Sequence, residues 1–90
     1  MIRSLVYTSQ FKRDYKKRSR EKNLDLILEE VLDLLMMGHS LDSRLKDHFL
    51  KGGYSGCREC HLKPDLLLIY ILSEKEVRLV RLGSHSELFD

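Results

Sequence analysis

The sequence contains no tryptophan, one proline, two cysteines and only 8% aromatic residues. Two cysteines cannot form the disulfide framework of a small secreted domain, so we expect a reducing compartment and a cytoplasmic protein. No apolar run approaches the about 20 residues of a membrane-spanning helix, and the N-terminus lacks the order of regions that marks a signal peptide. We therefore expect neither a secreted disulfide scaffold nor a membrane protein.

The chain has 90 residues, of which 42% are hydrophobic and 33% are charged. This balance is typical of a folded globular domain and not of a disordered tail. Because a chain of this length has room for only one hydrophobic core, we expect a single domain over residues 1–90.

The net charge of +2 conceals an uneven distribution of charge along the chain. Residues 1–22 hold eight lysines and arginines but only two acids, Asp14 and Glu21, whereas residues 23–37 hold four acids and no base. A basic block of this density can neutralise several phosphates of a nucleic acid, and a solvated helix face explains the same pattern, so both interpretations stay open. The candidate RNA- or ribosome-binding residues are Arg13, Lys16, Lys17 and Arg20.

The first half of the chain predicts one strand and two helices. Ile2 to Tyr7 has the composition of a short strand, and Thr8 can cap a helix that runs from about Ser9 to Lys22. Apolar residues at three-four spacing predict a second helix, with Asn23 as its N-cap and Gly38 as its stop. The short connection favours an antiparallel helical hairpin.

The second half consists of short apolar segments separated by turn residues, which predicts antiparallel strands. The predicted strands are Arg58 to Leu62, Leu66 to Leu72 and Val77 to Leu82, followed by a short helical turn from Ser86 to Phe89. The expected fold class is α+β: an N-terminal strand and a two-helix antiparallel hairpin packed on one face of a small, mainly antiparallel sheet. We expect the middle strand to be central and the other face of the sheet to be open.

Strict alternation in the last strand conflicts with this arrangement. If Arg81 points to the open face, then Val77 and Leu79 point there too. Either a β-bulge precedes Arg81 or the early part of the strand extends beyond the helices, and the sequence does not decide between them.

The string Cys57-Arg58-Glu59-Cys60-His61 matches the pattern of covalent haem attachment. It lies in a predicted strand without an export signal, and alternation sends Cys57 and Cys60 to opposite faces, so we interpret both as packing residues. The sequence also lacks a helical metal-binding motif, a glycine-rich phosphate loop and a nucleophilic serine elbow. We therefore expect no metal and no cofactor.

The histidines are the better candidates for chemistry. Alternation places Glu59 and His61 on the same face of their strand. His48 and His85 also lie near carboxylates in the sequence, namely Asp47 and Glu87. Imidazole exchanges protons near neutral pH, which suits general acid–base catalysis, although scattered histidines are also common on surfaces. His39 lies at a predicted helix end, where we give it a structural role.

Four segments of the second half carry family motifs in the same order. They are K-D-H-x-L-x-G at 46–52, R-x-x-H-x-x-P-D at 58–65, L-I-Y at 68–70 and R-x-G-[ST]-H-x-x-L-F at 81–89. Together they resemble the YafQ branch of the RelE family of bacterial toxins. The resemblance implies a RelE-like fold and a toxin of a toxin–antitoxin pair that acts as an mRNA interferase, a ribosome-dependent endoribonuclease. The implied partners are a cognate antitoxin, the ribosome and mRNA.

The resemblance also implies the site residues, which are His48, Glu59, His61, Asp65, Arg81, His85 and Phe89. Glu59 stands where close members of the branch carry aspartate, a change that keeps the charge. Leu66 replaces the tryptophan that the branch places after the Pro-Asp pair, which puts base stacking at that position in doubt.

These residue types suit RNA cleavage, since RNA carries its own nucleophile in the 2′-hydroxyl. The reaction needs a base for the hydroxyl proton, an acid for the leaving 5′-oxygen and a cation on the phosphate. We favour His48 as the base, His85 as the acid and Arg81 as the cation, while His61 or Asp65 can share the proton transfers. The alternatives are an inactive relative that acts as an antitoxin-binding co-repressor, and a small RNA-binding module.

Overall fold

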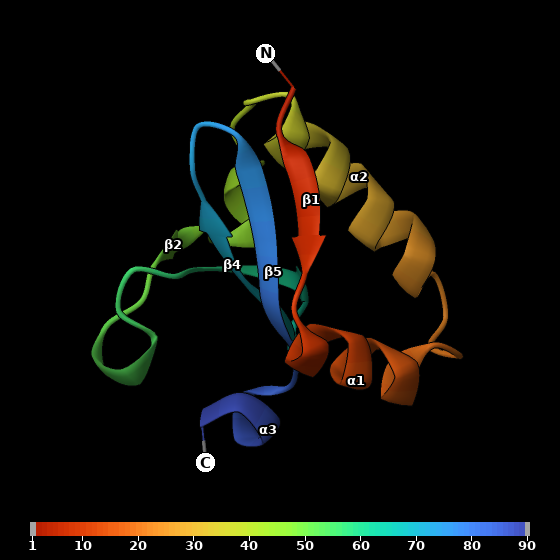
Figure 1. Cartoon of the computed structure of the whole chain (residues 1–90). Coiled ribbons are helices and arrows are strands. Elements are labelled where there is room, and N and C mark those ends of the chain that lie inside the picture. The colour runs from red at the N-terminus through yellow and green to blue at the C-terminus, as the bar shows by residue number, and fades with distance from the viewer. Residues whose placement is uncertain (1, 90) are drawn as a thin grey trace.

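The computed structural model describes residues 2–89, which form one α+β layer pair (Figure 1). None of the helices in this range is long and apolar enough to cross a membrane. The elements in chain order are β1 (Ser4–Tyr7), α1 (Ser9–Arg18), α2 (Leu24–Met36), η1 (Ser43–Leu45), β2 (His48–Phe49), η2 (Gly52–Tyr54), β3 (Arg58–Lys63), β4 (Leu66–Leu72), β5 (Glu76–Gly83) and α3 (His85–Phe89). The predicted fold class is confirmed.

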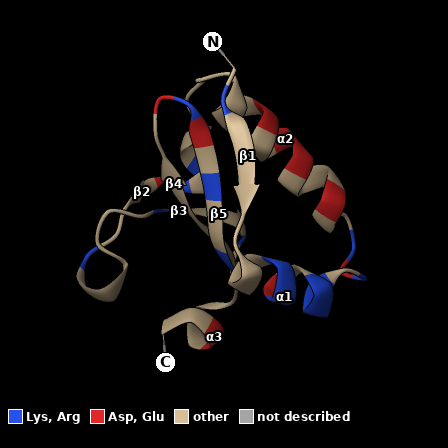
Figure 2. Cartoon of the chain, in the orientation of Figure 1, with Lys and Arg blue, Asp and Glu red and all other residues tan. Residues whose placement is uncertain are grey.

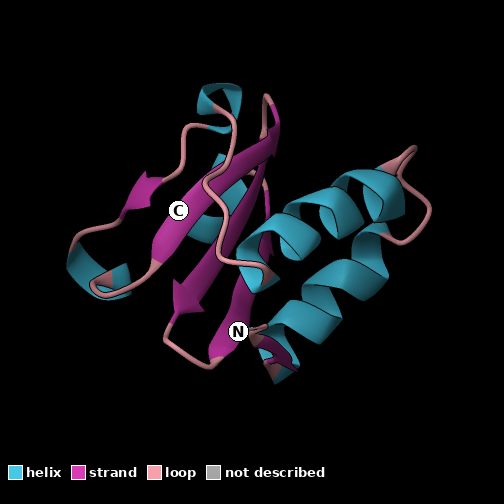
Figure 3. Cartoon of the chain, turned by 90° about the horizontal axis from the view of Figure 1, so that it is seen from above, coloured by secondary structure: helices cyan, strands magenta, loops and turns pink. Residues whose placement is uncertain are grey.

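The sheet has five strands in the order β1-β5-β4-β3-β2. β1 runs parallel to β5, and every other neighbouring pair is antiparallel. The almost wholly apolar β4 is therefore central, as predicted, because a strand buried on both faces needs apolar side chains on both. The helices α1 and α2 lie side by side against one face of the sheet (Figure 3). The short β2 was not predicted, since two residues give no alternation pattern.

The two main helices begin and end at identifiable residues. Thr8 caps α1, because its hydroxyl accepts the backbone N–H of Phe11 at 3.1 Å. Asn23 is the N-cap residue of α2, as predicted, but it has a left-handed backbone, with φ of 61°, and its side chain makes no capping hydrogen bond. The helix α1 ends at Arg18, earlier than predicted, and a turn over residues 19–23 leads to α2. Gly38, with φ of 77°, follows the end of α2 in the left-handed conformation that favours glycine.

Apolar residues are buried on both faces of the sheet. The main core between the sheet and the two long helices includes Phe11, Leu28, Cys60, Leu68 and Leu79. A second apolar cluster on the opposite face consists of Cys57, Leu67, Ile69 and Leu88. The expectation of an open face was thus wrong, because η2 and α3 cover part of it. The prediction that both cysteines are packing residues is confirmed, and burial raises the pKa of the Cys60 thiol to about 12.

A β-bulge in β5 resolves the conflict in its side-chain pattern. Leu79 pairs with Tyr70 and Arg81 pairs with Ile69, so Val80 is an extra residue in β5. An extra residue shifts the alternation by one, which lets Leu79 face the helices while Arg81 lies on the other face with Ile69. Of the two explanations left open by the sequence, the bulge is the correct one.

Glu87 ties the short helix α3 to the rest of the molecule. Its Oε1 accepts the backbone N–H of Ser84 at 2.8 Å and forms an ion pair with Arg18 of α1. Close packing also requires Gly83, since a Cβ there would lie 3.0 Å from Glu87 Oε1 and 3.3 Å from a methyl group of Leu88. The position of α3 therefore depends on a charged carboxylate.

We expect the stability of the protein to depend on Glu87 in acid. The Ser84 N–H and then Arg18 lower the pKa of Glu87 from 4.5 to about 2. Because the folded protein favours the ionised form, this stabilisation is present above pH 4.5 and is lost as the pH falls towards 2. Urea unfolding should show wild type more stable than Glu87→Gln at pH 6, with a difference that shrinks in acid. A difference independent of pH would contradict this assignment.

Candidate functional site

Glu59 brings two of the predicted histidines together. β2 pairs with β3 so that His48 lies opposite Glu59. Glu59 Oε2 is 3.1 Å from His48 Nε2 and 3.5 Å from His61 Nε2, and the centroids of the two imidazole rings are 6.4 Å apart. The carboxylate thus lies between two groups that can each carry a proton.

The contacts of His48 determine where protons lie. The side chain of Glu59 is only 5% exposed, and its Oε1 has no hydrogen-bond partner among residues 2–89. His48 Nδ1 contacts the carbonyl oxygen of Lys46, which can only accept a hydrogen bond, so Nδ1 is the donor. The other ring nitrogen of His48, Nε2, faces Oε2 of Glu59. This contact is a hydrogen bond only if one proton lies between the two atoms. The pair can therefore hold one exchangeable proton.

His85 and Phe89 reach this group from α3. Asp65 Oδ1 accepts the backbone N–H of His85 at 3.1 Å and lies 3.5 Å from its Nδ1. The sequence suggested Glu87 as the neighbour of His85, but Glu87 points to Arg18. The rings of His61 and His85 are 5.9 Å apart, and the ring of Phe89, which is 44% exposed, is 5.8 Å from that of His85.

Arg81 is held by a residue that the sequence did not single out. Asp14 of α1 accepts hydrogen bonds from Arg81 Nε at 2.7 Å and Nη2 at 3.2 Å, and also from the backbone N–H of Leu82 at 2.9 Å. Asp14 is 8% exposed, and its hydrogen bonds raise the pKa of Arg81. In the sequence Asp14 is merely an acid within a basic block, because its partner lies 67 residues away.

Tyr54 of η2 connects Arg81 to the aromatic end of the site. Its hydroxyl accepts a hydrogen bond from Arg81 Nη1 at 3.4 Å, and its ring packs edge-on against Phe89 with centroids 5.6 Å apart. No signal in the sequence identifies Tyr54, since it lies between turn glycines and meets Arg81 only through the fold.

A partly buried network holds β2 in place and thereby positions His48. Arg58 donates to both oxygens of Asp47, at 3.2 and 3.0 Å, and the hydroxyl of the buried Tyr70 bonds the same carboxylate. The Arg58 guanidinium also lies 4.3 Å from the centroid of the Phe49 ring. Burial and the bond to Asp47 raise the pKa of Tyr70. These contacts link β2, β3 and β4 next to the histidines.

The structure also locates the other residues that the sequence singled out. Leu66 is buried in the main core, so the side chain that this chain carries there does not stack on a base. Figure 2 shows lysine and arginine positions along α1, and the predicted basic side chains on or just after this helix are exposed. They are Arg13, Lys16, Lys17 and Arg20. The helix that carries Asp14 thus exposes the basic surface.

Six of the seven predicted site residues form one chain of contacts from His48 to Phe89, and Tyr54 links Phe89 to the seventh, Arg81. This cluster combines imidazole groups, which transfer protons, with a guanidinium, which binds phosphate oxygens. Within residues 2–89 no group of three or more histidine, cysteine, aspartate or glutamate side chains is arranged to hold a metal ion. The cluster is therefore equipped for acid–base chemistry on a phosphate ester.

Comparison with known proteins places this cluster in context. Residues 3–90 match the model of a family described as the bacterial toxin YafQ of type II toxin–antitoxin systems. The mRNA interferase toxin YafQ of Escherichia coli is 34% identical over 89 residues, which cover 97% of this chain and 96% of that protein.

Solved structures agree over the whole length of the chain. A metal-bound toxin from Helicobacter pylori is 43% identical, with 99% of this chain and 100% of that chain covered and a TM-score of 0.88. The E. coli DinJ-YafQ toxin–antitoxin complex matches with 33% identity, full coverage of both chains and a TM-score of 0.88. The chain belongs to the YafQ family of bacterial toxins from type II toxin–antitoxin systems.

Proposed function

We propose that this endoribonuclease toxin cleaves mRNA during translation, by general acid–base catalysis in which the 2′-hydroxyl attacks the adjacent phosphate. The observation that carries the proposal is the cluster of His48, Glu59, His61 and His85, which Phe89 and Tyr54 link to Arg81. The E. coli relative is an mRNA interferase, which supports messenger RNA as the substrate. The ribosome, a cytoplasmic partner, would present that substrate.

In the proposed mechanism the proton shared by His48 Nε2 and Glu59 Oε2 rests on Glu59, so that the lone pair of Nε2 is free to take the proton of the 2′-hydroxyl. His85 gives a proton to the leaving 5′-oxygen, and its backbone and Nδ1 are oriented by Asp65. The products are a 2′,3′-cyclic phosphate and a 5′-hydroxyl. Each proton transfer by a positioned side chain contributes about 10²- to 10⁴-fold to the rate.

Arg81 would stabilise the negative charge that develops on the phosphorane. Asp14 occupies its Nε and Nη2, which fixes the plane of the guanidinium and leaves Nη1 directed towards the Tyr54 hydroxyl. A donor held in place before the reaction costs no reorganisation when charge develops. Phe89, whose ring is partly exposed beside His85, can stack on a base of the message.

The scheme requires no metal ion, because side chains activate the 2′-hydroxyl and protonate the leaving group. A related H. pylori toxin has been solved with bound metal, so this part of the proposal needs its own test. We expect toxin that has been treated with a chelator and then desalted to cleave at the untreated rate, with ribosomal magnesium left intact.

Ribosome dependence is tested by comparing translated and untranslated copies of one message. In a reconstituted translation system the toxin should cut the message within its reading frame, and removing the start codon should protect the same sequence. Equal cleavage of both copies would contradict ribosome dependence. No cleavage of either copy by a folded protein would favour the inactive co-repressor.

The basic side chains on α1 give a further prediction. If they bind ribosomal RNA, replacing Lys16 and Arg20 by glutamate removes attraction and adds repulsion, so ribosome binding should fall at least about 10-fold and depend less on salt. Both residues are exposed, so the melting temperature should barely change. Cosedimentation with ribosomes measures the effect. Undiminished binding by a folded double variant would show that the basic surface is only solvated.

We further propose that an antitoxin neutralises the chain, as the E. coli complex of DinJ with YafQ suggests. Because the toxin must enter a confined site on the ribosome, a bound protein can inhibit it by bulk alone. Coexpression of the protein encoded next to this chain should then rescue growth.

A further inference from the structure

Phe49 is the most exposed large apolar side chain among residues 2–89, with 66% of its surface accessible to solvent. It lies on β2, the outermost strand of the sheet, directly after His48. Neither apolar cluster of the described residues includes it, so packing does not explain an aromatic residue here. Leaving its apolar surface in contact with water costs free energy relative to burying it. The ring is therefore a candidate contact for a ligand.

Arg58 holds the Phe49 ring from one side. The Cζ atom of its guanidinium lies over the ring, 4.3 Å from the centroid, where the cation is attracted to the aromatic face. Asp47 accepts hydrogen bonds from Arg58 Nε and Nη2, which fixes the plane of the guanidinium. The ring is thus held in place before a ligand arrives, and a group held in advance binds at a lower entropic cost.

The side chains nearest to Phe49 along the chain are basic. Lys46 precedes it by three residues, Lys51 follows it by two, and both are exposed. Neither lysine forms an ion pair within residues 2–89, whereas the nearby acid Asp47 is paired with Arg58. Proteins that bind single-stranded RNA combine cations, which contact phosphates, with exposed aromatic rings, which stack on nucleobases. This part of β2 provides both.

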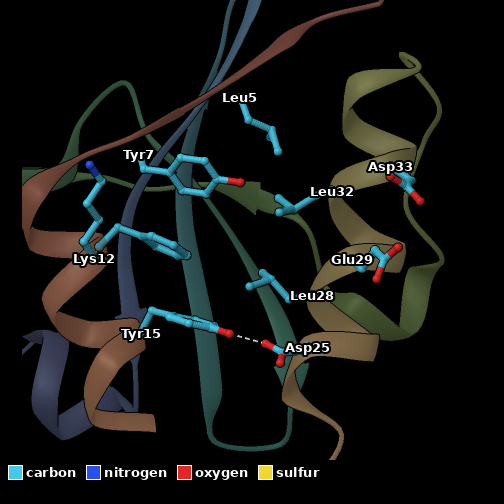
Figure 4. Close-up of a pocket in the computed structure, with 10 residues that line it drawn as sticks. Leu5, Tyr7, Lys12, Tyr15, Asp25, Leu28, Glu29, Leu32 and Asp33 are labelled. Carbon is cyan, nitrogen blue, oxygen red and sulfur yellow. Dashed lines mark hydrogen bonds between the residues drawn. The ribbon is translucent and has the colours of Figure 1, made fainter. Parts of the chain in front are cut away.

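Tyr7 shows what distinguishes Phe49 from an exposed aromatic residue elsewhere. Tyr7 is 46% exposed and lines a hollow between α1 and α2 (Figure 4). The charged residues that line this hollow are one lysine and three acids: Lys12, Asp25, Glu29 and Asp33. Carboxylates repel the phosphates of RNA, and the lining includes none of the seven predicted site residues. Phe49, with its basic surroundings and its place beside His48, is the better site for a nucleotide.

The position of Phe49 relative to His48 determines which part of the message it meets. Consecutive residues of a strand point to opposite sides, so His48 lies with Glu59 and the Phe49 ring lies across β2, with Arg58. Because β2 is two residues long and forms the edge of the sheet, an RNA strand can pass around it and contact both exposed side chains. In the proposed mechanism His48 deprotonates the 2′-hydroxyl, which belongs to the nucleotide on the 5′ side of the cleaved bond.

We propose that Phe49 stacks on a base of the message on the 5′ side of the cleaved bond, with Lys46 and Lys51 close to the flanking phosphates. This inference rests on the proposed function and adds a base contact to it. Phe89, which lies beside His85, would contact the message on the 3′ side. A message held on both sides of the reacting phosphate is aligned for attack by its 2′-hydroxyl.

Substitutions at Phe49 provide the first test, on ribosomes halted at one codon. Phe49→Leu keeps an apolar side chain but removes the ring, so the cleavage rate at subsaturating toxin should fall by about 5-fold or more, as for the loss of one base–aromatic contact. Phe49→Tyr, which retains an aromatic ring, should recover most of this loss. Tyr7→Leu is the matched control, because it makes the same change at the other exposed ring, and it should cleave within about twofold of wild type. The melting temperature of each variant checks folding.

Removing a base from the message identifies the contact itself. Messages would carry an abasic nucleotide at one or the other of the two positions on the 5′ side of the cleaved bond. At the position that stacks on Phe49, base removal should slow cleavage by wild type by about 5-fold or more. The same message should slow cleavage by Phe49→Leu by less than about twofold, because that variant has already lost the contact.

The outcomes separate this contact from the proposed function. If wild type leaves the intact message uncut, the proposed function fails and the Phe49 contact with it. If wild type cleaves and Phe49→Leu or Tyr7→Leu equals Phe49→Leu in its rate, with no loss specific to Phe49, the proposed function stands but the Phe49 contact is overturned. It is also overturned if Phe49→Leu slows cleavage while base removal affects both proteins equally, because the ring then contacts the ribosome and not the message.

Discussion

Replacing His85 by alanine should lower single-turnover cleavage of a translated message by about 10²- to 10⁴-fold, the range for loss of one general acid or base. Replacing Arg81 by alanine should cause a loss of about 10²- to 10³-fold, as expected when a donor to a developing oxyanion is removed. His85 is exposed on α3, so its replacement leaves the core intact. Quantifying cleaved message in the reconstituted translation system measures both effects.

Arg81 requires a second variant, because its removal strands a buried carboxylate. Without Arg81, Asp14 keeps only the Leu82 N–H as a partner, and an unsatisfied buried group costs about 1 to 3 kcal/mol of stability. Arg81→Lys retains the positive charge opposite Asp14 but loses the paired donors of the guanidinium. We expect this variant to remain folded and yet cleave poorly. Wild-type cleavage by Arg81→Lys and His85→Ala would refute both assignments.

The second large effect is expected at Asp14, which acts through Arg81. Asp14→Asn keeps the shape of the side chain but removes the negative charge that orients the guanidinium. We expect cleavage to fall by about 10- to 100-fold, since misplacing a catalytic group costs up to about two orders of magnitude. Binding of the toxin to the ribosome should not change. The loss of activity should therefore appear in the cleavage rate measured at saturating ribosome concentration.

Glu21, the other acid in the basic block of residues 1–22, provides a matched control for Asp14. Glu21→Gln also removes one acid from the basic block, but Glu21 pairs with Arg18 and Lys63 and does not contact Arg81. It should cleave at nearly the wild-type rate. If Asp14→Asn and Glu21→Gln behave alike in folded proteins, Asp14 has no special role in positioning Arg81.

Local patterns in the sequence predict most of the fold. Leu66 to Leu72 forms β4 with the predicted bounds, and the other predicted strands differ by one or two residues at their ends. These elements are predictable because alternation, turn residues and the Thr8 cap act within a few residues. The parallel pairing of β1 with β5 joins residues about 70 positions apart, and no local pattern encodes it.

The candidate site is predictable only in part, because some of its contacts join residues that are far apart in the sequence. Motif spacing identifies the histidines and Arg81; the structure brings the histidines together and links Arg81 to them through Tyr54 and Phe89. Asp14 and Tyr54 could not be found, since each depends on a tertiary contact with Arg81. The bulge at Val80, which determines where Arg81 points, was one of two explanations that alternation allowed.

The central claim is that the message supplies its own nucleophile and that the histidine cluster moves the protons. The most direct measurement uses a translated message in which the nucleotide before the cleavage position carries 2′-hydrogen in place of 2′-hydroxyl. The account predicts that this message stays intact, while the unmodified message yields a 2′,3′-cyclic phosphate and a 5′-hydroxyl at the same position. Cleavage of the 2′-deoxy message at the normal rate would contradict it.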